Sequence, residues 1–406
     1  MFGSVFGSAV RLLIATRYAG LVGGVETYLR VVIPRLMEAG FELGVLCEVP
    51  APDGGIVAGL DGVPRWSASG RAVDATLADV SKWRPDVVYS HGMADANLET
   101  ALAARYPTIA FAHNYFGTCI SGTKCHARPV AEPCERVFGP GCLAAYFPRR
   151  CGGLNPLTAL GLYRTQRRRN RMLGDFHTVL VASRHMAAEM IRNGVPANRV
   201  HLVPLFPTDS TPDPEPPSVC PQRSKLLFVG RLTALKGLSH LIRAIPLAEA
   251  NLGRRLTLLV AGEGSERANC EAEARRLGVD AEFVGWVDTP RREAEMRTAD
   301  LLVVPSVWPE PFGLVGIEAG CVGLPAVAYE VGGIPDWLEP GVSGEMAPGE
   351  RPDPSELAAA IVRALGDPVH WQKLRVGAWE VARRFSVEAH LDRLLPILEA
   401  AASTKS

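Results

Sequence analysis

Two glutamates stand eight residues apart in the segment Pro309-Glu310-Pro311-Phe312-Gly313-Leu314-Val315-Gly316-Ile317-Glu318. The sequence predicts a loop around Glu310 and a helix that carries Glu318. A helix start offers unpaired N–H groups and a partial positive charge to a phosphate, and Gly313 lets a ligand approach the backbone closely. Because an ionised carboxylate only accepts hydrogen bonds, Glu318 suits the two hydroxyls of a ribose. A solvated helix start without a ligand is the alternative.

A second candidate site follows an expected strand over 225–229, where Gly230 precedes Arg231 and, five residues later, Lys236. Two fixed cations suit a diphosphate. A diphosphate that leaves during group transfer gains negative charge, so these cations would stabilise the transition state without a metal ion. An ordinary basic surface loop is the alternative. A third and weaker motif, Gly23-Gly24-Val25-Glu26, leads a strand into a helix start and suits a phosphate or an acceptor.

These motifs lie between short apolar strands and amphipathic helices, an alternation that is typical of α/β folds with parallel sheets. The first unit is a strand over 11–16, a helix over 25–38 that Pro34 can kink, and a strand over 41–47. Further elements are expected as strands over 86–90, 108–112, 179–182, 225–229, 256–261, 281–284, 301–304 and 326–328, a helix over 94–105, and a helical tail over 354–402 interrupted near Phe385.

Six prolines between 205 and 222 break this alternation and predict a linker, because proline fits neither a helix interior nor a central strand. The expected division is a first domain over 1–205, a linker over 206–223, a second domain over 224–385, and a final helix over 386–406 that crosses back to the first domain. Two α/β halves imply a cleft, and ligands of such sheets bind at the carboxyl ends of the strands.

Together these motifs resemble the family 4 retaining glycosyltransferases of the GT-B fold, over nearly the whole chain. The resemblance also rests on Gly262-Glu263-Gly264 and Gly332-Gly333-Ile334-Pro335-Asp336. It implies two Rossmann-like domains whose parallel sheets face each other across a cleft. It further implies a UDP-sugar or GDP-sugar donor in the second domain, and a glycan, lipid-linked or small-molecule acceptor in the first. Retention of anomeric configuration, no cofactor required for catalysis, and a role in cell-surface polysaccharide or glycolipid synthesis are also implied.

Under this resemblance, Glu310 contacts the donor sugar, Glu318 holds the ribose, and the two cations hold the diphosphate. His113 matches the family's active-site histidine, and His91, which also follows a strand end, is its rival. A lone histidine is often only a structural hydrogen-bonding group. The catalytic set is His113, Glu310, Arg231 and Lys236. The donor-binding set is Gly24, Gly230, Arg231, Lys236, Glu310, Phe312, Gly313, Leu314, Val315 and Glu318.

Residues 117–156 depart from the family pattern, because they hold five cysteines together with His126. The cysteine spacings contain no Cys-x-x-Cys pair, so a standard zinc ribbon is not matched. Four of the thiols could still close a structural zinc site, which a segment with little core would need. One or two disulfides, or unlinked thiols, are the alternatives. The segment follows His113 and is expected to form part of the acceptor pocket. The cysteines are Cys119, Cys125, Cys134, Cys142 and Cys151.

A basic stretch follows, with a helix expected over 157–173. The arginines of this stretch, which begins before the helix, have no acidic neighbour before Asp175. They are Arg149, Arg150, Arg164, Arg167, Arg168, Arg169 and Arg171. A basic amphipathic helix is typical of membrane-surface elements, so an anionic membrane surface is an expected partner. A solvated face, or a site for RNA or an anionic acceptor, is the alternative. No motif matches an RNA-recognition module, and no nucleic-acid partner is expected.

The composition and the missing motifs exclude several other classes. The 406 residues have a formal net charge of zero and are 47% hydrophobic, as in a globular protein. With neither a long apolar run nor a signal-peptide pattern, the expected location is the cytoplasm, peripheral on the cell membrane's inner face if lipid is bound. The missing Gly-x-Gly-x-x-Gly motif disfavours a dinucleotide-dependent oxidoreductase, and the Pro-Glu-Pro-Phe-Gly context disfavours a sugar-nucleotide epimerase. A non-catalytic sugar-nucleotide-binding protein of the same fold remains the alternative.

Overall fold

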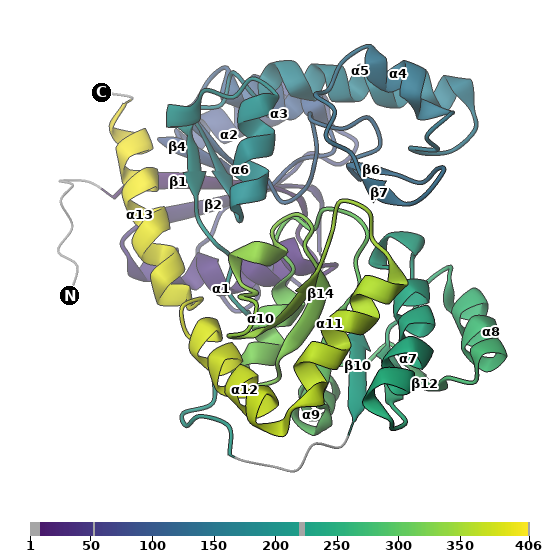
Figure 1. Ribbon diagram of the computed structural model, residues 1–406. Helices are drawn as coiled ribbons and strands as arrows, with labels where there is room; N and C mark the ends of the chain where they lie inside the picture. The colour runs from purple at the N-terminus through teal and green to yellow at the C-terminus, as the bar shows by residue number, and fades with distance from the viewer. Residues whose placement is uncertain (1–8, 52, 219–223, 405–406) are drawn as a thin grey trace.

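The computed structural model describes residues 9–51, 53–218 and 224–404, which form two α/β domains that face each other (Figure 1). The first domain holds a seven-stranded parallel sheet. Its strands lie in the order β3 (Arg65–Ser67), β2 (Glu42–Val49), β1 (Arg11–Tyr18), β4 (Val87–Ser90), β5 (Thr108–Phe111), β8 (Thr178–Val181) and β9 (Val200–Leu202). The second domain holds a six-stranded parallel sheet. Its strands lie in the order β12 (Asp280–Gly285), β11 (Thr257–Ala261), β10 (Lys225–Val229), β13 (Leu301–Val304), β14 (Ala326–Tyr329) and β15 (Gly344–Ala347).

Helices cover both faces of these sheets, which is why the central strands are continuous apolar runs. Along β1, Leu12 and Ile14 pack with the first helix of the chain, whereas Leu13 and Ala15 pack on the opposite face. The first-domain helices are α1 (Gly24–Glu38), α2 (Val73–Trp83), α3 (Ala96–Ala103), α4 (Gly141–Tyr146), α5 (Pro156–Met172) and α6 (Arg184–Arg192). The second-domain helices are α7 (Leu238–Leu252), α8 (Arg267–Leu277), α9 (Thr289–Thr298), α10 (Leu314–Cys321), α11 (Pro354–Gly366) and α12 (Pro368–Ala382).

Both sheets are doubly wound, as the sequence predicts, and the strand order reverses between β1 and β4 and again between β10 and β13. Such reversal points open a crevice at the carboxyl ends of the strands, where ligands of this architecture bind. The strands over 65–67, 200–202 and 344–347 lie at the sheet edges and were not predicted. They are short, and a polar residue interrupts each of them, so none shows the continuous apolar run by which the central strands are recognised. Helix α1 continues through Pro34 without an interruption.

The segment between the sheets lies along the second domain rather than free of it. The carbonyl of Asp213 accepts a hydrogen bond from Trp379 Nε1 at 2.8 Å, and its carboxylate pairs with Arg297 at 2.7 Å. Residues 219–223 of the predicted linker, and 1–8 and 405–406 of the predicted terminal segments, are outside the described residues.

The last helix, α13 (Val387–Ser403), returns to the first domain and runs along it (Figure 1). His390 on this helix meets the hydroxyl of Tyr28 at 2.8 Å and the carbonyl of Pro204 at 2.7 Å. The chain therefore passes between the domains twice. Among the described residues, no helix is both long and apolar enough to span a membrane.

Candidate active site

The predicted site residues lie in loops at the carboxyl ends of strands, or in the helices that these loops lead into, close to the reversal points of both sheets. In the first domain, Gly24 follows β1, His91 follows β4 and His113 follows β5. In the second domain, Arg231 follows β10 and Glu310 follows β13. Because parallel strands place the loops of neighbouring strands at one edge, residues far apart in the sequence come together there.

Glu310 is the centre of the second-domain site. Its Oε1 accepts hydrogen bonds from Lys236 Nζ at 2.6 Å and from Ser306 Oγ at 2.5 Å. The Glu310 side chain is only 6% exposed, and that of Lys236 is 29% exposed. An ammonium group has three donors, so two N–H groups of Lys236 stay available to a ligand. The structure thus joins two residues that the sequence assigned separately, to the sugar and to the diphosphate.

The backbone around Glu310 depends on the Gly332-Gly333-Ile334-Pro335-Asp336 motif. Gly332 has φ of +58°, and a Cβ at this position would lie 2.2 Å from the Glu310 carbonyl oxygen, so only glycine fits. Gly333 N donates to the same carbonyl at 2.7 Å. At the end of the motif, Asp336 accepts hydrogen bonds from the backbone N of Arg184 at 2.6 Å and from its Nε at 2.7 Å. The motif therefore supports the glutamate loop and contacts the first domain.

The second glutamate lies inside helix α10. Gly313, with φ of +90°, precedes the helix, and no side chain of the described residues caps its start. Burial raises the pKa of Glu318, and Arg292, whose Nε lies 3.6 Å away, opposes that shift. Ribose hydroxyls that donate to the carboxylate would favour its charged form. Phe312 is buried, whereas Arg231 is exposed and makes no ion pair within the described ranges.

Sequence reasoning missed three side chains of this site: Ser306, Trp308 and Arg292. Lys236 Nζ lies 5.7 Å from the ring centroid of Trp308, a distance at which a cation is attracted by the aromatic face. The indole N–H of Trp308 is buried and has no partner among the described residues. The tryptophan directly before the Pro-Glu-Pro sequence was a signal available in the chain, whereas the contacts of Ser306 and Arg292 arise only from the fold.

His113 and His91 belong to one cluster. His91 Nδ1 and His113 Nε2 are 2.9 Å apart, so one ring donates a hydrogen bond to the other. Burial lowers both pKa values, that of His113 to about 3, and both rings are neutral near pH 7. Next to them, the Tyr28 hydroxyl lies 2.8 Å from the hydroxyl of Tyr89 and 2.8 Å from His390 Nε2. A neutral His113 can exchange hydrogen bonds with sugar hydroxyls, and His91 holds its ring.

The five cysteines of residues 117–156 and His126 line one cavity of about 20 Å³. All five thiols are free, and Cys151 Sγ lies 3.8 Å from His126 Nδ1. Burial raises the pKa of Cys125 to about 12 and of Cys151 to about 11. Within the described part of the chain, no three candidate ligands are placed to hold a metal ion. This geometry gives the zinc site no support, and zinc stays a prediction.

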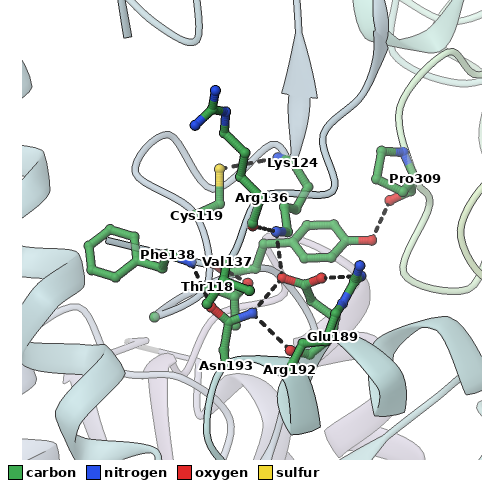
Figure 2. Close-up of polar contacts among 12 residues, drawn as sticks. Thr118, Cys119, Lys124, Arg136, Val137, Phe138, Glu189, Arg192, Asn193 and Pro309 are labelled. Atoms are coloured by element: carbon green, nitrogen blue, oxygen red, sulfur yellow. Dashed lines mark hydrogen bonds and ion pairs between the residues drawn. The ribbon is translucent and has the colours of Figure 1, made fainter. Parts of the chain in front are cut away.

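A buried ion pair attaches the cysteine-rich segment to helix α6. Lys124 Nζ lies 2.6 Å from Glu189 Oε1, with side chains that are 2% and 0% exposed. Glu189 also accepts hydrogen bonds from Arg192 and Asn193, and Asn193 in turn accepts one from the backbone N of Phe138 (Figure 2). Because every charge in this network is paired, the segment docks on α6 in a defined position.

The basic helix α5 divides into an inner and an outer face. Arg169 is buried: it donates to the carbonyls of Met93 and Ala94 at 2.6 and 2.8 Å and lies 3.7 Å from Glu99. Arg169, one of the seven arginines of the basic stretch, therefore does not belong to an exposed basic surface. The exposed outer face carries Leu157, Leu160, Arg164, Arg167, Arg168 and Arg171.

Two family models match the chain, one in each half. The description "Glycosyltransferase Family 4" applies to residues 22–206, and "Glycosyl transferases group 1" applies to residues 214–384. The chain is 37% identical over 186 residues to D-inositol 3-phosphate glycosyltransferase 1 of Catenulispora acidiphila, covering 43% of this chain and 44% of that protein. It is 30% identical to glycogen synthase of Mycobacterium tuberculosis, covering 72% of this chain and 63% of that protein.

A solved structure similar to the whole chain is that of Anabaena Alr3699/HepE in complex with UDP and glucose. Its TM-score is 0.67 at 18% identity, covering 96% of this chain and 100% of that one, which shows a shared fold. The sequence matches to curated relatives cover less of each protein than this structural match does. For three of these relatives, the chain spans between 36% and 44% of their length.

Proposed function

Because the chain belongs to the family 4-type glycosyltransferases and has the GT-B fold, we propose that it moves a sugar from a nucleoside-diphosphate sugar to an acceptor held by the first domain. One observation carries this proposal. Tyr115, two residues after His113, donates a hydrogen bond of 2.7 Å to the carbonyl of Pro309, next to Glu310. This contact brings the histidine loop of one domain to the glutamate loop of the other, where a donor sugar between the domains would meet both.

Each side chain then has a role that its chemistry allows. Arg231 and the two available donors of Lys236 neutralise the diphosphate, whose charge grows as it leaves, and so stabilise the transition state without a metal ion. Glu318 accepts hydrogen bonds from the ribose hydroxyls. Glu310 and the neutral His113 hold the hydroxyls of the transferred sugar, and the anomeric configuration is retained.

The donor class is tested by thermal shift with UDP-, GDP- and ADP-sugars, because a ligand at about 100 times its Kd stabilises the fold by about 2.7 kcal/mol. The sugar nucleotide that stabilises the protein should then be hydrolysed slowly in water, and its sugar should be transferred to an acceptor. Nuclear magnetic resonance of the product reports the anomeric configuration. Binding without any turnover would instead favour the non-catalytic alternative, and an inverted product would refute retention.

We further propose that the acceptor is reached at an anionic membrane surface through the outer face of α5. Leu157 is 79% exposed at one end of this face, and four exposed arginines follow along it. An apolar tip with adjacent cations is the pattern of an interfacial helix. Each cation near an anionic leaflet contributes about 1 kcal/mol, so a few of them give salt-sensitive adhesion.

The test compares two triple variants in sedimentation with phosphatidylserine vesicles at low salt. Changing Arg164, Arg167 and Arg171 to Gln should abolish vesicle binding and leave nucleotide binding unchanged. The control changes three exposed arginines of the second domain, Arg275, Arg276 and Arg291, to Gln with the same loss of charge. A wild-type protein that ignores the vesicles would refute the membrane proposal and favour a soluble acceptor.

A further inference from the structure

The loop that carries Glu310 is held by the first domain through alternate backbone carbonyls. The carbonyl of Pro309 accepts a hydrogen bond from the Tyr115 hydroxyl at 2.7 Å, and that of Pro311 accepts one from Ser183 Oγ at 2.6 Å. Figure 2 shows the Pro309 carbonyl at the edge of the polar network of the cysteine-rich segment. A third carbonyl, two residues before Pro309, lies 3.7 Å from Cys125 Sγ, which is a weaker donor.

The other side of the loop faces its own domain. Glu310 Oε1 meets Lys236 at 2.6 Å, the Glu310 carbonyl accepts the N–H of Gly333 at 2.7 Å, and Trp308 lies beside the same lysine. Proline has no N–H, so the carbonyl is the only backbone hydrogen-bonding group that Pro309 and Pro311 each have. The two proline carbonyls on either side of Glu310 are therefore bound by the first domain, while the Glu310 carbonyl is bound by the second.

The first-domain donors are themselves fixed. Tyr115 is fully buried and packs in a core cluster with Val179 and Met186. Ser183 is also fully buried, and its Oγ caps α6 by accepting a hydrogen bond from Met186 N at 3.2 Å. Tyr115 lies two residues before the cysteine-rich segment, which the buried Lys124–Glu189 pair fastens to the same helix. A rigid support of this kind can fix the position of a neighbouring loop.

We propose that Tyr115 and Ser183 are positioning residues, which place the Glu310 carboxylate by holding the two proline carbonyls on either side of it. The Glu310 carboxylate is then correctly placed only when the two domains are in contact through these hydrogen bonds. The cysteine-rich segment helps to hold Tyr115 in place. This inference rests on the proposed function, since it assumes that Glu310 contacts the donor sugar.

The test uses Tyr115→Phe, which removes one hydroxyl and keeps the buried ring. Tyr146→Phe is the matched control, because the Tyr146 hydroxyl lies in the adjacent cysteine-rich segment, is buried, and has no hydrogen-bond partner among the described residues. Two measurements are made on the full chain: amide hydrogen exchange of the 306–318 peptide in the free protein, and turnover and KM for the donor identified by thermal shift.

Tyr115→Phe should increase exchange in the 306–318 peptide and lower kcat about tenfold, with KM changed less than twofold. The lost buried hydrogen bond should lower the melting temperature by only about 2–4 °C. Tyr146→Phe should change neither measurement. Ser183→Ala should also speed exchange there, and Ser183→Thr, which keeps the hydroxyl, should restore it. Wild-type exchange in Tyr115→Phe would overturn the positioning role even if the protein transfers sugar. If exchange is fast in Tyr115→Phe but the wild-type protein turns over no donor, the positioning contact stands and the proposed function is refuted.

Discussion

Lys236→Ala separates catalysis from stability at this site. If Lys236 stabilises the leaving diphosphate, turnover at saturating donor should fall about 100-fold, which corresponds to about 2.7 kcal/mol of transition-state stabilisation. The effect on folding should be much smaller. Lys236 is 29% exposed, and a solvent-accessible ion pair contributes about 1 kcal/mol or less. A loss of that size lowers the melting temperature of a domain of this length by about 2–4 °C.

Lys225→Ala is the matched control. Lys225 Nζ lies 2.9 Å from Glu295 outside the site, and Lys225 is 26% exposed, close to the 29% of Lys236, although Glu295 at 20% is more exposed than Glu310 at 6%. Loss of the Lys225–Glu295 pair should lower the melting temperature by a similar amount and leave turnover unchanged. The assay is donor consumption at saturating donor, with melting followed by circular dichroism. If Lys236→Ala keeps more than about a third of wild-type turnover, the diphosphate role of Lys236 is wrong.

Four further predictions concern the carboxylate in α10, the buried histidines, the cations at the diphosphate and the cysteines. Burial raises the pKa of Glu318, so the charge of this carboxylate opposes folding at neutral pH. The Glu318→Gln variant should therefore melt at the same or a higher temperature. Calorimetry should nevertheless show nucleotide binding weakened about tenfold or more, because the carboxylate that accepts the ribose hydroxyls is lost. Burial lowers the pKa of His113 to about 3 and that of His390 to about 4 in the folded protein, from the usual 6.5. Below pH 6.5 the unfolded chain therefore binds more protons than the folded protein. The free energy of unfolding should fall as the pH drops from 6.5 to 4. A His390→Gln variant with an unchanged slope in a melting series over this range would contradict the assignment to that residue. Sugar transfer should survive brief EDTA treatment, because Arg231 and Lys236, rather than a metal ion, neutralise the leaving diphosphate. If the cysteines hold a structural zinc, elemental analysis should find about one zinc per chain, whereas nine titratable thiols and no metal would refute it.

Much of the fold could be predicted because its causes are local in the sequence. Apolar strands such as 225–229 and 301–304 alternate with amphipathic helices, and a parallel sheet covered by helices buries both faces of such strands. The loops after these strands carry the site residues, because carboxyl ends are where this architecture leaves backbone groups and side chains free for ligands. The edge strands over 65–67 and 200–202 were missed, since pairing with a neighbour rather than any pattern of their own makes them strands.

Residue identity and spacing by themselves therefore determined the two-domain architecture and the candidate residues Glu310, Glu318, Arg231 and Lys236, and the family resemblance added His113. Only the tertiary structure decided which of them act together. It joined Lys236 to Glu310, made His91 a partner of His113, and turned Arg169 inward to meet Glu99. It also brought the carbonyls beside Glu310 to Tyr115 and Ser183 of the other domain. Such contacts link residues tens to hundreds of positions apart, and their geometry follows from how whole elements pack, which no local pattern of residues encodes.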